Sequence, residues 1–385
     1  MANHESQISS LAVCLESEKL PFHLTLKGHD TNRKLWLVEP DNFGRFAPYE
    51  AQNLVRTLAL AHLIAPHLPK IIETNWPVEA TEILSGLYEH YKQKGPVIKK
   101  IYPQIKPPFV TGEGRQPARL KHASATSGGA DSAYRITDCL RRKEGVVGVH
   151  IQNLNKGPLA EAIASEKQCR VWQVPYKRIK LVNSSGNGGY STMRTRDLFI
   201  AGLCAVASLP YGIEDVRIEG GMIDNPDRCE YSEYTGAWKT FNRLLTSYGL
   251  GIQVQGIDPG EIETVGEIIK IEQELKIPVI ALIQNCFSAP YQLPNNRRKW
   301  ERETPVLSSA SPEQWCGSCF KCRRLSLGRL YFADPNLSKV PENETRFFVE
   351  DTLRWMEVYR HNEHLMSENF VSHLLELKQR YGFPS

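Results

Sequence analysis

Apolar and polar positions alternate first with the period of β-strands and then with that of helices. The N-terminal part carries two strand patterns and two helix patterns, at residues 22–26, 34–38, 48–64 and 77–94. The turn-rich residues 27–33 join the two strand patterns and predict a hairpin. These elements predict an accessory α+β domain over residues 1–115, which ends in the Pro- and Gly-rich linker 102–115.

Beyond residue 115, strand patterns and helix patterns alternate along the chain. We expect strands at residues 120–126, 144–151, 171–174, 216–220 and 252–255, and helices at 133–140, 198–208, 238–248 and 261–275. This order predicts the α/β class, with a doubly wound parallel sheet in a domain over residues 116–335. Two further helix patterns, at 344–359 and 363–381, predict C-terminal helices within residues 336–385.

Composition changes this picture little. The chain has 385 residues, of which 41% are hydrophobic and 23% charged, and this suffices for a sizeable core. No apolar run has the length that crosses a membrane, so we expect no membrane partner. A net charge of +4 does not call for nucleic acid, and basic clusters such as Arg323-Arg324 are more often solvated faces. The cysteines show no disulfide pattern and no signal peptide is evident, which favours the cytoplasm.

The segment Ser127–Ser132 reads Ser-Gly-Gly-Ala-Asp-Ser and directly precedes a helix pattern. Backbone N–H groups can wrap a pyrophosphate only where no Cβ stands in the way, and helix amides would point at the same phosphates. The segment therefore predicts an ATP site, although an ordinary turn is the plain alternative. The residues expected to hold ATP are Thr126, Ser127, Gly128, Gly129, Asp131 and Ser132. No Walker pattern occurs in the chain, so nothing favours γ-phosphate transfer.

Four cysteines form a second candidate site, in which Cys286 is followed after a long gap by Cys316, Cys319 and Cys322. Four thiolates suit a closed, tetrahedral zinc site of structural type. An iron–sulfur cluster is the rival interpretation, because cysteines at two-residue spacing also hold such clusters. The other five cysteines are scattered, and His62, His67 and His90 are too dispersed for a metal and are expected at the surface or partly buried.

The glycine segment resembles the signature of the PP-loop ATP pyrophosphatases, which cleave ATP between the α and β phosphates. Together with the Cys-Gly-x-Cys-x-x-Cys motif, it is similar to the QueC family, the 7-cyano-7-deazaguanine synthases. Arg196 before an apolar helix, Glu219-Gly220, and the segment from Asp224 through Asp227 to Cys229 extend the resemblance over residues 118–332.

Three departures from that pattern set the chain apart from the housekeeping enzymes. The gap between Cys286 and Cys316 is longer, Pro259 and Gly260 stand where a Lys is usual, and residues 1–115 are additional. These features resemble the QueC-like branch of bacterial antiphage islands, which includes QatC and CBASS-associated relatives.

The resemblance implies an AMP- and pyrophosphate-forming ligase of the C–N type that uses ATP, Mg²⁺ and a structural Zn²⁺. Asp131 would support Mg²⁺, Ser127 would assist at the phosphates, and Arg196 would meet the phosphate or the substrate carboxylate. Glu219, Asp224 and Asp227 would read the guanine-like edge of a deazaguanine carboxylate.

The amine acceptor is left open by the sequence. The extra domain and the long insertion favour an amino group of a partner protein, and ammonia is the alternative, as in the pathway enzyme. A tRNA-modifying PP-loop enzyme and a nucleotide-binding scaffold without turnover are the other candidates.

Overall fold

The structure is a computed structural model of the 385-residue chain. It describes residues 10–15, 23–28, 31–38, 49–76, 78–100, 119–152, 159–183, 194–220, 223–257, 259–260, 262–284, 307, 315, 317, 319–338, 340–359 and 368–381. The chain divides into two compact units. Unit 1 takes Met1–Thr126, Lys143–Gly157 and Val174–Ile257, and unit 2 takes Ser127–Arg142, Pro158–Gln173 and Asp258–Ser385.

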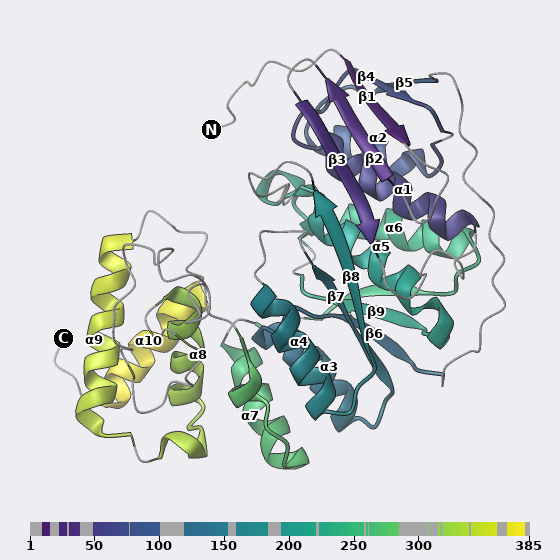
Figure 1. Cartoon of the computed structure of the whole chain (residues 1–385). Helices are drawn as coiled ribbons and strands as arrows, with labels where there is room; N and C mark the ends of the chain where they lie inside the picture. The colour runs from purple at the N-terminus through teal and green to yellow at the C-terminus, as the bar shows by residue number, and fades with distance from the viewer. Residues whose placement is uncertain are drawn as a thin grey trace. The chain divides into compact units, whose positions relative to one another are not determined.

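Unit 1 is built on one sheet of ten strands, in the order β10-β9-β6-β7-β8-β3-β2-β1-β4-β5. The strands are β1 (Ser10–Leu15), β2 (His23–Gly28), β3 (Thr31–Val38), β4 (Ile71–Thr74), β5 (Val97–Lys100), β6 (His122–Ala125), β7 (Val146–Gln152), β8 (Tyr176–Asn183), β9 (Asp215–Ile218) and β10 (Gln253–Gly256). Figure 1 shows the long β8 next to β7 and the N-terminal strands in purple.

Five consecutive strands of this sheet, from β10 to β8, pair in parallel. β7 follows β6 on one side, β8 follows β7, and β9 returns to the other side of β6, so the strand order reverses between β6 and β9. The short β6 has small, buried residues, and β7 is a buried run rich in Val, as expected for strands covered on both faces. The expectation of an α/β fold with a parallel sheet is thus confirmed, and the order is compatible with a doubly wound, Rossmann-like fold.

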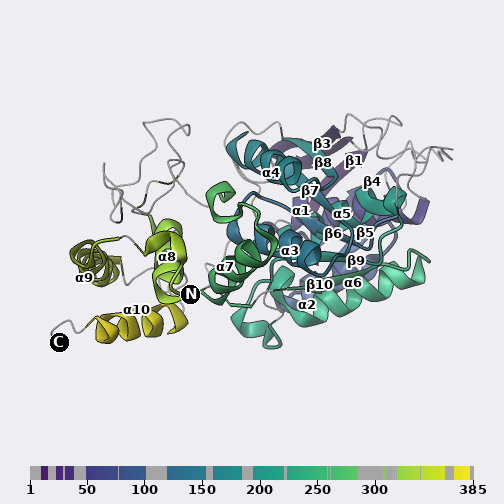
Figure 2. The same ribbon diagram turned by 90° about the horizontal axis from the view of Figure 1, so that it is seen from below.

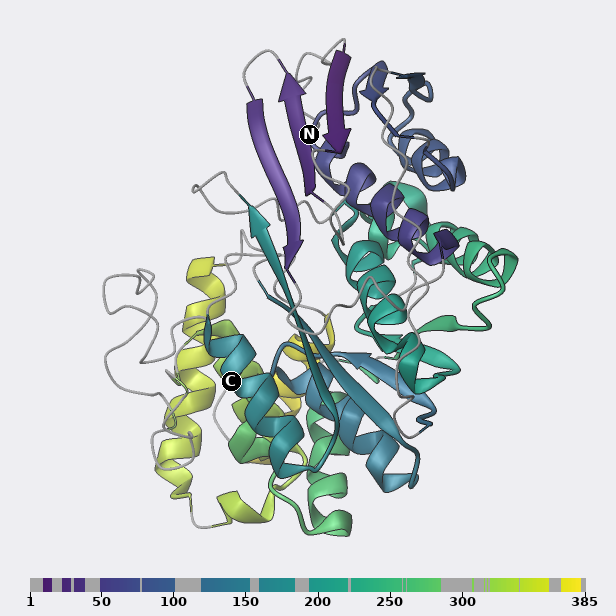
Figure 3. The same cartoon turned by 45° about the vertical axis from the view of Figure 1, so that its right-hand side comes forward.

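The predicted N-terminal hairpin is also confirmed, because β2 and β3 pair antiparallel. β3 continues into an antiparallel pairing with β8, in which Leu37 lies opposite Leu181. The hairpin therefore extends the same sheet that holds the parallel strands, as Figure 3 shows for β3 and β8.

Among the described residues of unit 1, four α-helices occur: α1 (Tyr49–Ile64), α2 (Thr81–His90), α5 (Arg196–Ser208) and α6 (Thr235–Ser247). α1 and α5 are buried along nearly their whole length because they pack against each other. A Cβ on Gly202 of α5 would lie 2.3 Å from Leu58 Cδ1 of α1, so the missing side chain permits this close approach. Both helices belong to one hydrophobic core that also takes in the β7 and β9 side chains.

Unit 2 consists of helices: α3 (Ala130–Arg141), α4 (Leu159–Val171), α7 (Glu263–Leu275), α8 (Phe320–Tyr331), α9 (Glu342–Tyr359) and α10 (Glu368–Arg380). Along the chain, α3 connects β6 to β7 and α4 connects β7 to β8, the order expected of parallel strands. α8, α9 and α10 share a core of Phe, Leu and Trp side chains, and Figure 2 shows the three helices together.

One strand prediction is wrong. Residues 171–174 do not form a strand, because Val171 ends α4 and Gln173 has a left-handed φ of 57° in the turn that follows. The strand of this region, β8, begins at Tyr176. The helix expected at 77–94 is shorter, and the linker 102–115 lies outside the described residues.

Candidate functional site

The glycine segment lies in unit 2, at the N-terminal end of α3. Gly129 is the N-cap residue, and Gly128 before it has a left-handed φ of 77°, which L-residues rarely adopt. The first amides of a helix have no intrahelical acceptors, so the loop presents backbone donors together with the positive end of the helix dipole. This arrangement is the one that binds phosphate at helix N-termini.

The carbonyl of Gly128 is fixed from two directions. Gln168 Nε2 of α4 donates to it at 2.9 Å, and the backbone N–H of Gln284 donates at 2.8 Å. A Cβ on Gly128 would lie 2.7 Å from Ala164 Cβ. α4 therefore holds the loop in place, and Gly128 is required for that packing as well as for its φ.

The two serines of the segment differ in burial. Ser132 is buried, and its Oγ donates to the Gly129 carbonyl at 3.0 Å, which closes the first turn of α3. Ser127 is exposed, and its Oγ accepts from the Gly129 N–H at 3.4 Å. Ser132 therefore braces the loop, whereas the Ser127 hydroxyl is accessible to a ligand.

Asp131 lies in the first turn of α3, where its carboxylate forms an ion pair with Arg324 of α8. Arg324 Nη2 and Asp131 Oδ2 are 3.3 Å apart, and the two side chains are 12% and 17% exposed. Carboxylate oxygens are ligands that Mg²⁺ prefers, so the chemistry of Asp131 is compatible with the predicted cofactor. The arginine was not predicted as part of this site.

In unit 1, Thr126 and Glu219 follow two neighbouring parallel strands, β6 and β9, at the point where the strand order reverses. The register pairs Ser124 with Arg217, so the two residues directly follow the paired strand ends. Ligands of such sheets bind outside the carboxyl ends at the reversal point. The Oγ1 of Thr126 is buried and has no hydrogen-bond partner among the described residues.

His150 of β7 belongs to the same strand ends. Its Nδ1 lies 2.8 Å from the Thr126 carbonyl, and because a carbonyl only accepts, Nδ1 carries the proton. Burial lowers the pKa of His150 to about 4. The hydrogen bond to the Thr126 carbonyl opposes this shift, and the charge of Arg178 adds to it. His150 is thus neutral and fixes the backbone just before Ser127.

Arg196 begins α5, as predicted, and its Nε lies 2.8 Å from Asp197 Oδ1. Burial opposes the charge of Arg196, but the carboxylates of Asp197, Glu219 and Glu233 together outweigh it and raise the pKa of the guanidinium. Arg196 is therefore a permanent cation, and Glu219 lies within its electrostatic range. The carboxylate of a substrate would find its counter-charge here.

His62 of α1 lies beside this arginine. Its Nδ1 is 3.1 Å from Thr195 Oγ1, and its Nε2 has no partner among the described residues. Burial, with the charge of Arg196, lowers the pKa of His62 to about 3. The expectation of a surface or partly buried histidine is wrong at this position, because His62 is fully buried.

Asp224 and Asp227 lie on a segment that we call the 223–234 segment. Both side chains are exposed, and Asp227 pairs with Lys92 Nζ at 2.8 Å just after α2. The lysine lowers the pKa of the Asp227 carboxyl. Asp227 is therefore engaged with the N-terminal region, whereas no ion pair of Asp224 is found in the described part of the chain.

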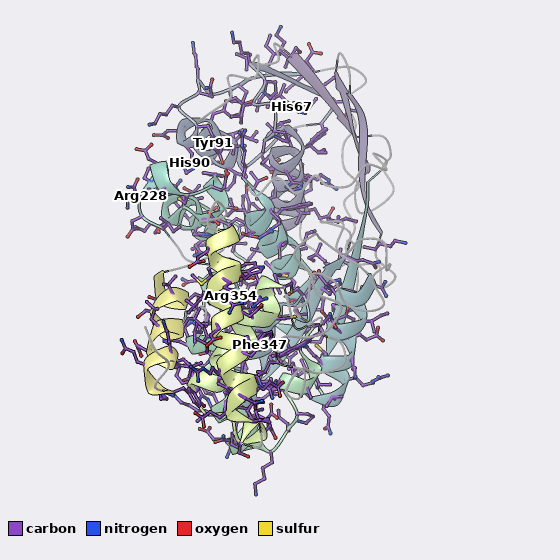
Figure 4. The ribbon with its side chains drawn as sticks, turned by 90° about the vertical axis from the view of Figure 1, so that its left-hand side faces the viewer. His67, His90, Tyr91, Arg228, Phe347 and Arg354 are labelled. Carbon is purple, nitrogen blue, oxygen red and sulfur yellow. The ribbon has the colours of Figure 1, made fainter. Side chains whose placement is uncertain are left out.

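The 223–234 segment is attached to the end of α2 by three further contacts. His90 Nε2 donates to the Cys229 carbonyl at 2.9 Å, Tyr91 Oη donates to a Glu230 carboxylate oxygen, and the Tyr231 N–H donates to Tyr91 Oη at 3.3 Å. Figure 4 shows His90 and Tyr91 next to Arg228 of this segment. No local sequence pattern predicts these contacts, because they join residues about 140 positions apart.

The guanidinium of Arg194 lies 4.5 Å from the centroid of the Tyr91 ring. Arg194 also donates to the Ala65 carbonyl at 2.7 Å, and its own carbonyl accepts from Ser232. Ala65, directly after α1, and Tyr91, directly after α2, thus both contact Arg194, and Tyr91 also contacts the 223–234 segment.

Of the four predicted metal ligands, Cys319 and Cys322 are described, and Cys286 and Cys316 lie outside the described residues. Cys319 is the N-cap of α8 and Cys322 lies within its first turn, so the pair has the i, i+3 spacing of one helix face. Both are fully buried. Two neighbouring thiols of this kind fit half of a four-cysteine zinc site.

No family model matches the chain, and no curated protein matches it. Among the helices that the structure describes, none has the length and apolar character needed to cross a bilayer.

Proposed function

We propose that this chain is a QueC-like PP-loop ATP pyrophosphatase that adenylates a deazaguanine-type carboxylate and couples it to an amine of a partner protein. The observation that carries the proposal is the loop Ser127–Ser132, with a left-handed Gly128 and the N-terminus of α3 directly behind it. The buried, unpartnered hydroxyl of Thr126 at the end of β6 supports the same interpretation. The cysteine motif and the sequence resemblance add the deazaguanine substrate class.

The chemistry begins with a carboxylate, which is a poor electrophile. An oxygen of the substrate carboxylate attacks the α-phosphorus of ATP, the bond to the bridging oxygen breaks, and pyrophosphate leaves with the electron pair. The amine then attacks the acyl carbon of the adenylate, loses its proton, and AMP departs. Catalysis of this type depends on positioning and charge stabilisation.

The chain's own residues have separate tasks in this reaction. The loop amides and the Ser127 hydroxyl hold the departing pyrophosphate, and Arg196 binds the substrate carboxylate. Glu219, Asp224 and Asp227 accept hydrogen bonds from the guanine-like edge. When bound, Mg²⁺ neutralises phosphate charge, and Asp131 would hold it or its waters.

The four cysteines would hold a structural zinc ion, and the setting we propose is antiphage defence in the bacterial cytoplasm. Residues 1–115, through α1 and α2, contact the segments that carry Arg196 and Asp227. This additional region distinguishes the proposed protein-modifying enzyme from a small synthase that uses ammonia.

The direct test is to incubate the purified chain with ATP, Mg²⁺ and 7-carboxy-7-deazaguanine, with and without the product of a neighbouring gene, and to weigh the products. We expect AMP, pyrophosphate and a partner protein heavier by the acyl group. Asp131→Ala and Ser127→Ala should abolish AMP release, while Glu350→Ala on the exposed side of α9 should not. Wild-type rates in the Asp131 variant would refute the mechanism.

A further inference from the structure

Three arginines of α8, the helix that carries Cys322, each form an ion pair with an acid. Arg323 Nη2 is 2.8 Å from Asp351 Oδ2, and Arg329 Nε is 2.7 Å from Asp334 Oδ2. Both pairs are buried among residues of the C-terminal part. Such short, charge-assisted contacts hold the two guanidinium groups in one place.

Arg324 differs from its two neighbours in partner and in geometry. Its partner is Asp131 of the glycine loop, 193 positions earlier in the chain. The contact of 3.3 Å is longer than the other two pairs and longer than the usual charge-assisted range of about 2.7 to 2.9 Å. The Asp131 carboxylate carries a single charge, so a polyphosphate, which carries more, can compete for the guanidinium.

The charge of the loop favours a cation such as Arg324 beside it. The segment Ser127–Ser132 contains no Lys or Arg, and Asp131 adds a negative charge to it. At the far end of α3, Arg141 and Arg142 are already paired with Asp138. A polyphosphate at the loop would lie beside the Asp131 carboxylate, and like charges at short range repel strongly at a poorly solvated site, so a cation beside the loop would stabilise the bound phosphates.

We propose that Arg324 binds the phosphates of the nucleotide, a role that rests on the proposed ATP-dependent function. Asp131 holds the guanidinium beside the loop. When Mg²⁺ and ATP bind, the phosphates take Arg324 from Asp131, and the freed carboxylate becomes available to the metal. The planar guanidinium suits this exchange, because it binds carboxylate and phosphate oxygens with the same donors.

The position of Arg324 ties the nucleotide site to the cysteine motif. Arg324 lies two residues after Cys322, within the first turns of a helix whose N-cap is Cys319. Because the cysteines lie at the start of α8, a metal that holds them would also hold the start of this helix. It would thereby determine the position from which Arg324 reaches Asp131.

The test measures binding rather than turnover, by titration calorimetry with ATP plus Mg²⁺ and with inorganic pyrophosphate. We expect Arg324→Gln to weaken both by about tenfold or more, Arg324→Lys to retain part of the affinity, and Arg346→Gln on the exposed face of α9 to change nothing. Wild-type affinity in Arg324→Gln would overturn the inference. A wild-type chain that binds neither ligand would instead refute the proposed function, and the inference with it.

A second variant separates phosphate binding from a structural ion pair. Asp131→Asn releases Arg324, so pyrophosphate without Mg²⁺ should bind about threefold or more tightly than to the wild type, and Arg324→Gln added to it should cancel the gain. If the pair served stability alone, Asp131→Asn would leave this affinity unchanged or lower it, and that result would overturn the inference. Thermal unfolding of each variant identifies any that does not fold. If Arg324→Gln does not fold, the pyrophosphate affinity of Asp131→Asn relative to the wild type decides between the two roles of the ion pair.

Discussion

Gly128 packs directly against Ala164, so closely that a Cβ on the glycine would lie 2.7 Å from the Cβ of the alanine. The next glycine, Gly129, is different, because its φ of −80° and ψ of 177° are ordinary for any residue. The two glycines therefore have separate reasons to be present. The first is required by the packing of α4, and the second becomes necessary only if a ligand approaches the backbone.

This difference gives the first prediction. Gly128→Ala should destabilise the fold by at least about 1 kcal/mol, because it combines a left-handed φ with steric overlap. Gly129→Ala should leave the unfolding transition close to wild type and yet abolish ATP binding, since its methyl group blocks phosphate from the amides. Chemical denaturation and calorimetry on both variants check this. Normal ATP affinity in Gly129→Ala would mean that the loop is a structural turn.

The regular part of the fold was predictable because its signals are local. β7 is rich in β-branched residues, and the apolar pattern of residues 198–208 predicted α5 to within two residues of its start at Arg196. α4 was not predicted, since its helix has exposed apolar residues such as Ile163 and mostly small buried ones. Val171, Trp172 and Val174 together have the apolar pattern of a strand. The left-handed φ of Gln173 nevertheless places a turn between Trp172 and Val174.

The candidate site was predictable only where its residues are neighbours in the chain. The loop around Gly128 and the arginine at the start of α5 both have sequence patterns. Arg324 had none, because a basic pair on a helix is normally solvated, and its acid partner is remote in sequence. His90 and Tyr91 likewise contact a segment far along the chain, and no periodicity reports such a contact.

Tyr91 should position the 223–234 segment for the substrate carboxylate. Tyr91→Phe removes the hydrogen bonds to Glu230 and Tyr231 but keeps the ring beneath Arg194. We expect a higher KM for the carboxylate substrate, an unchanged affinity for ATP, and little change in kcat. Steady-state kinetics with each substrate varied in turn measures the three quantities.

The next residue, Lys92, provides a control for the Tyr91 variant. Lys92→Gln breaks the ion pair to Asp227 between two largely exposed side chains, which solvent already screens. The exposed Asp227 carboxylate stays available to the substrate without this screened pair, so the kinetics should match the wild type. Equal KM increases in both variants would indicate general loosening of the segment and would contradict a specific role of Tyr91.

The purified protein should contain one zinc ion per chain, measured by elemental analysis, and no iron. Cys319→Ser should lose the metal and become less soluble, because it removes a proposed ligand, a buried thiol at the start of α8. Cys169→Ser provides the matched control. Burial raises the pKa of the Cys169 thiol to about 12, so this residue remains a thiol and the variant should keep its zinc. Stoichiometric iron with visible absorbance would instead support the iron–sulfur interpretation.

The stability of unit 1 should fall in mild acid because of His150. The folded state holds this imidazole neutral, with a pKa of about 4, whereas in the unfolded chain it takes up a proton near its ordinary pKa of 6.5. The unfolded state therefore binds more protons between these values, and the stabilisation is complete above pH 6.5 and lost as the pH falls toward 4. From pH 7 to pH 5 the loss from this one residue should be about 2 kcal/mol.

His150→Asn isolates that contribution. The amide group can still donate to the Thr126 carbonyl but does not titrate, so the variant should start less stable at pH 7 and lose about 2 kcal/mol less than the wild type on going to pH 5. Urea unfolding at the two pH values measures both slopes. Parallel curves for the His150 variant and the wild type would show that this imidazole is not held neutral by burial.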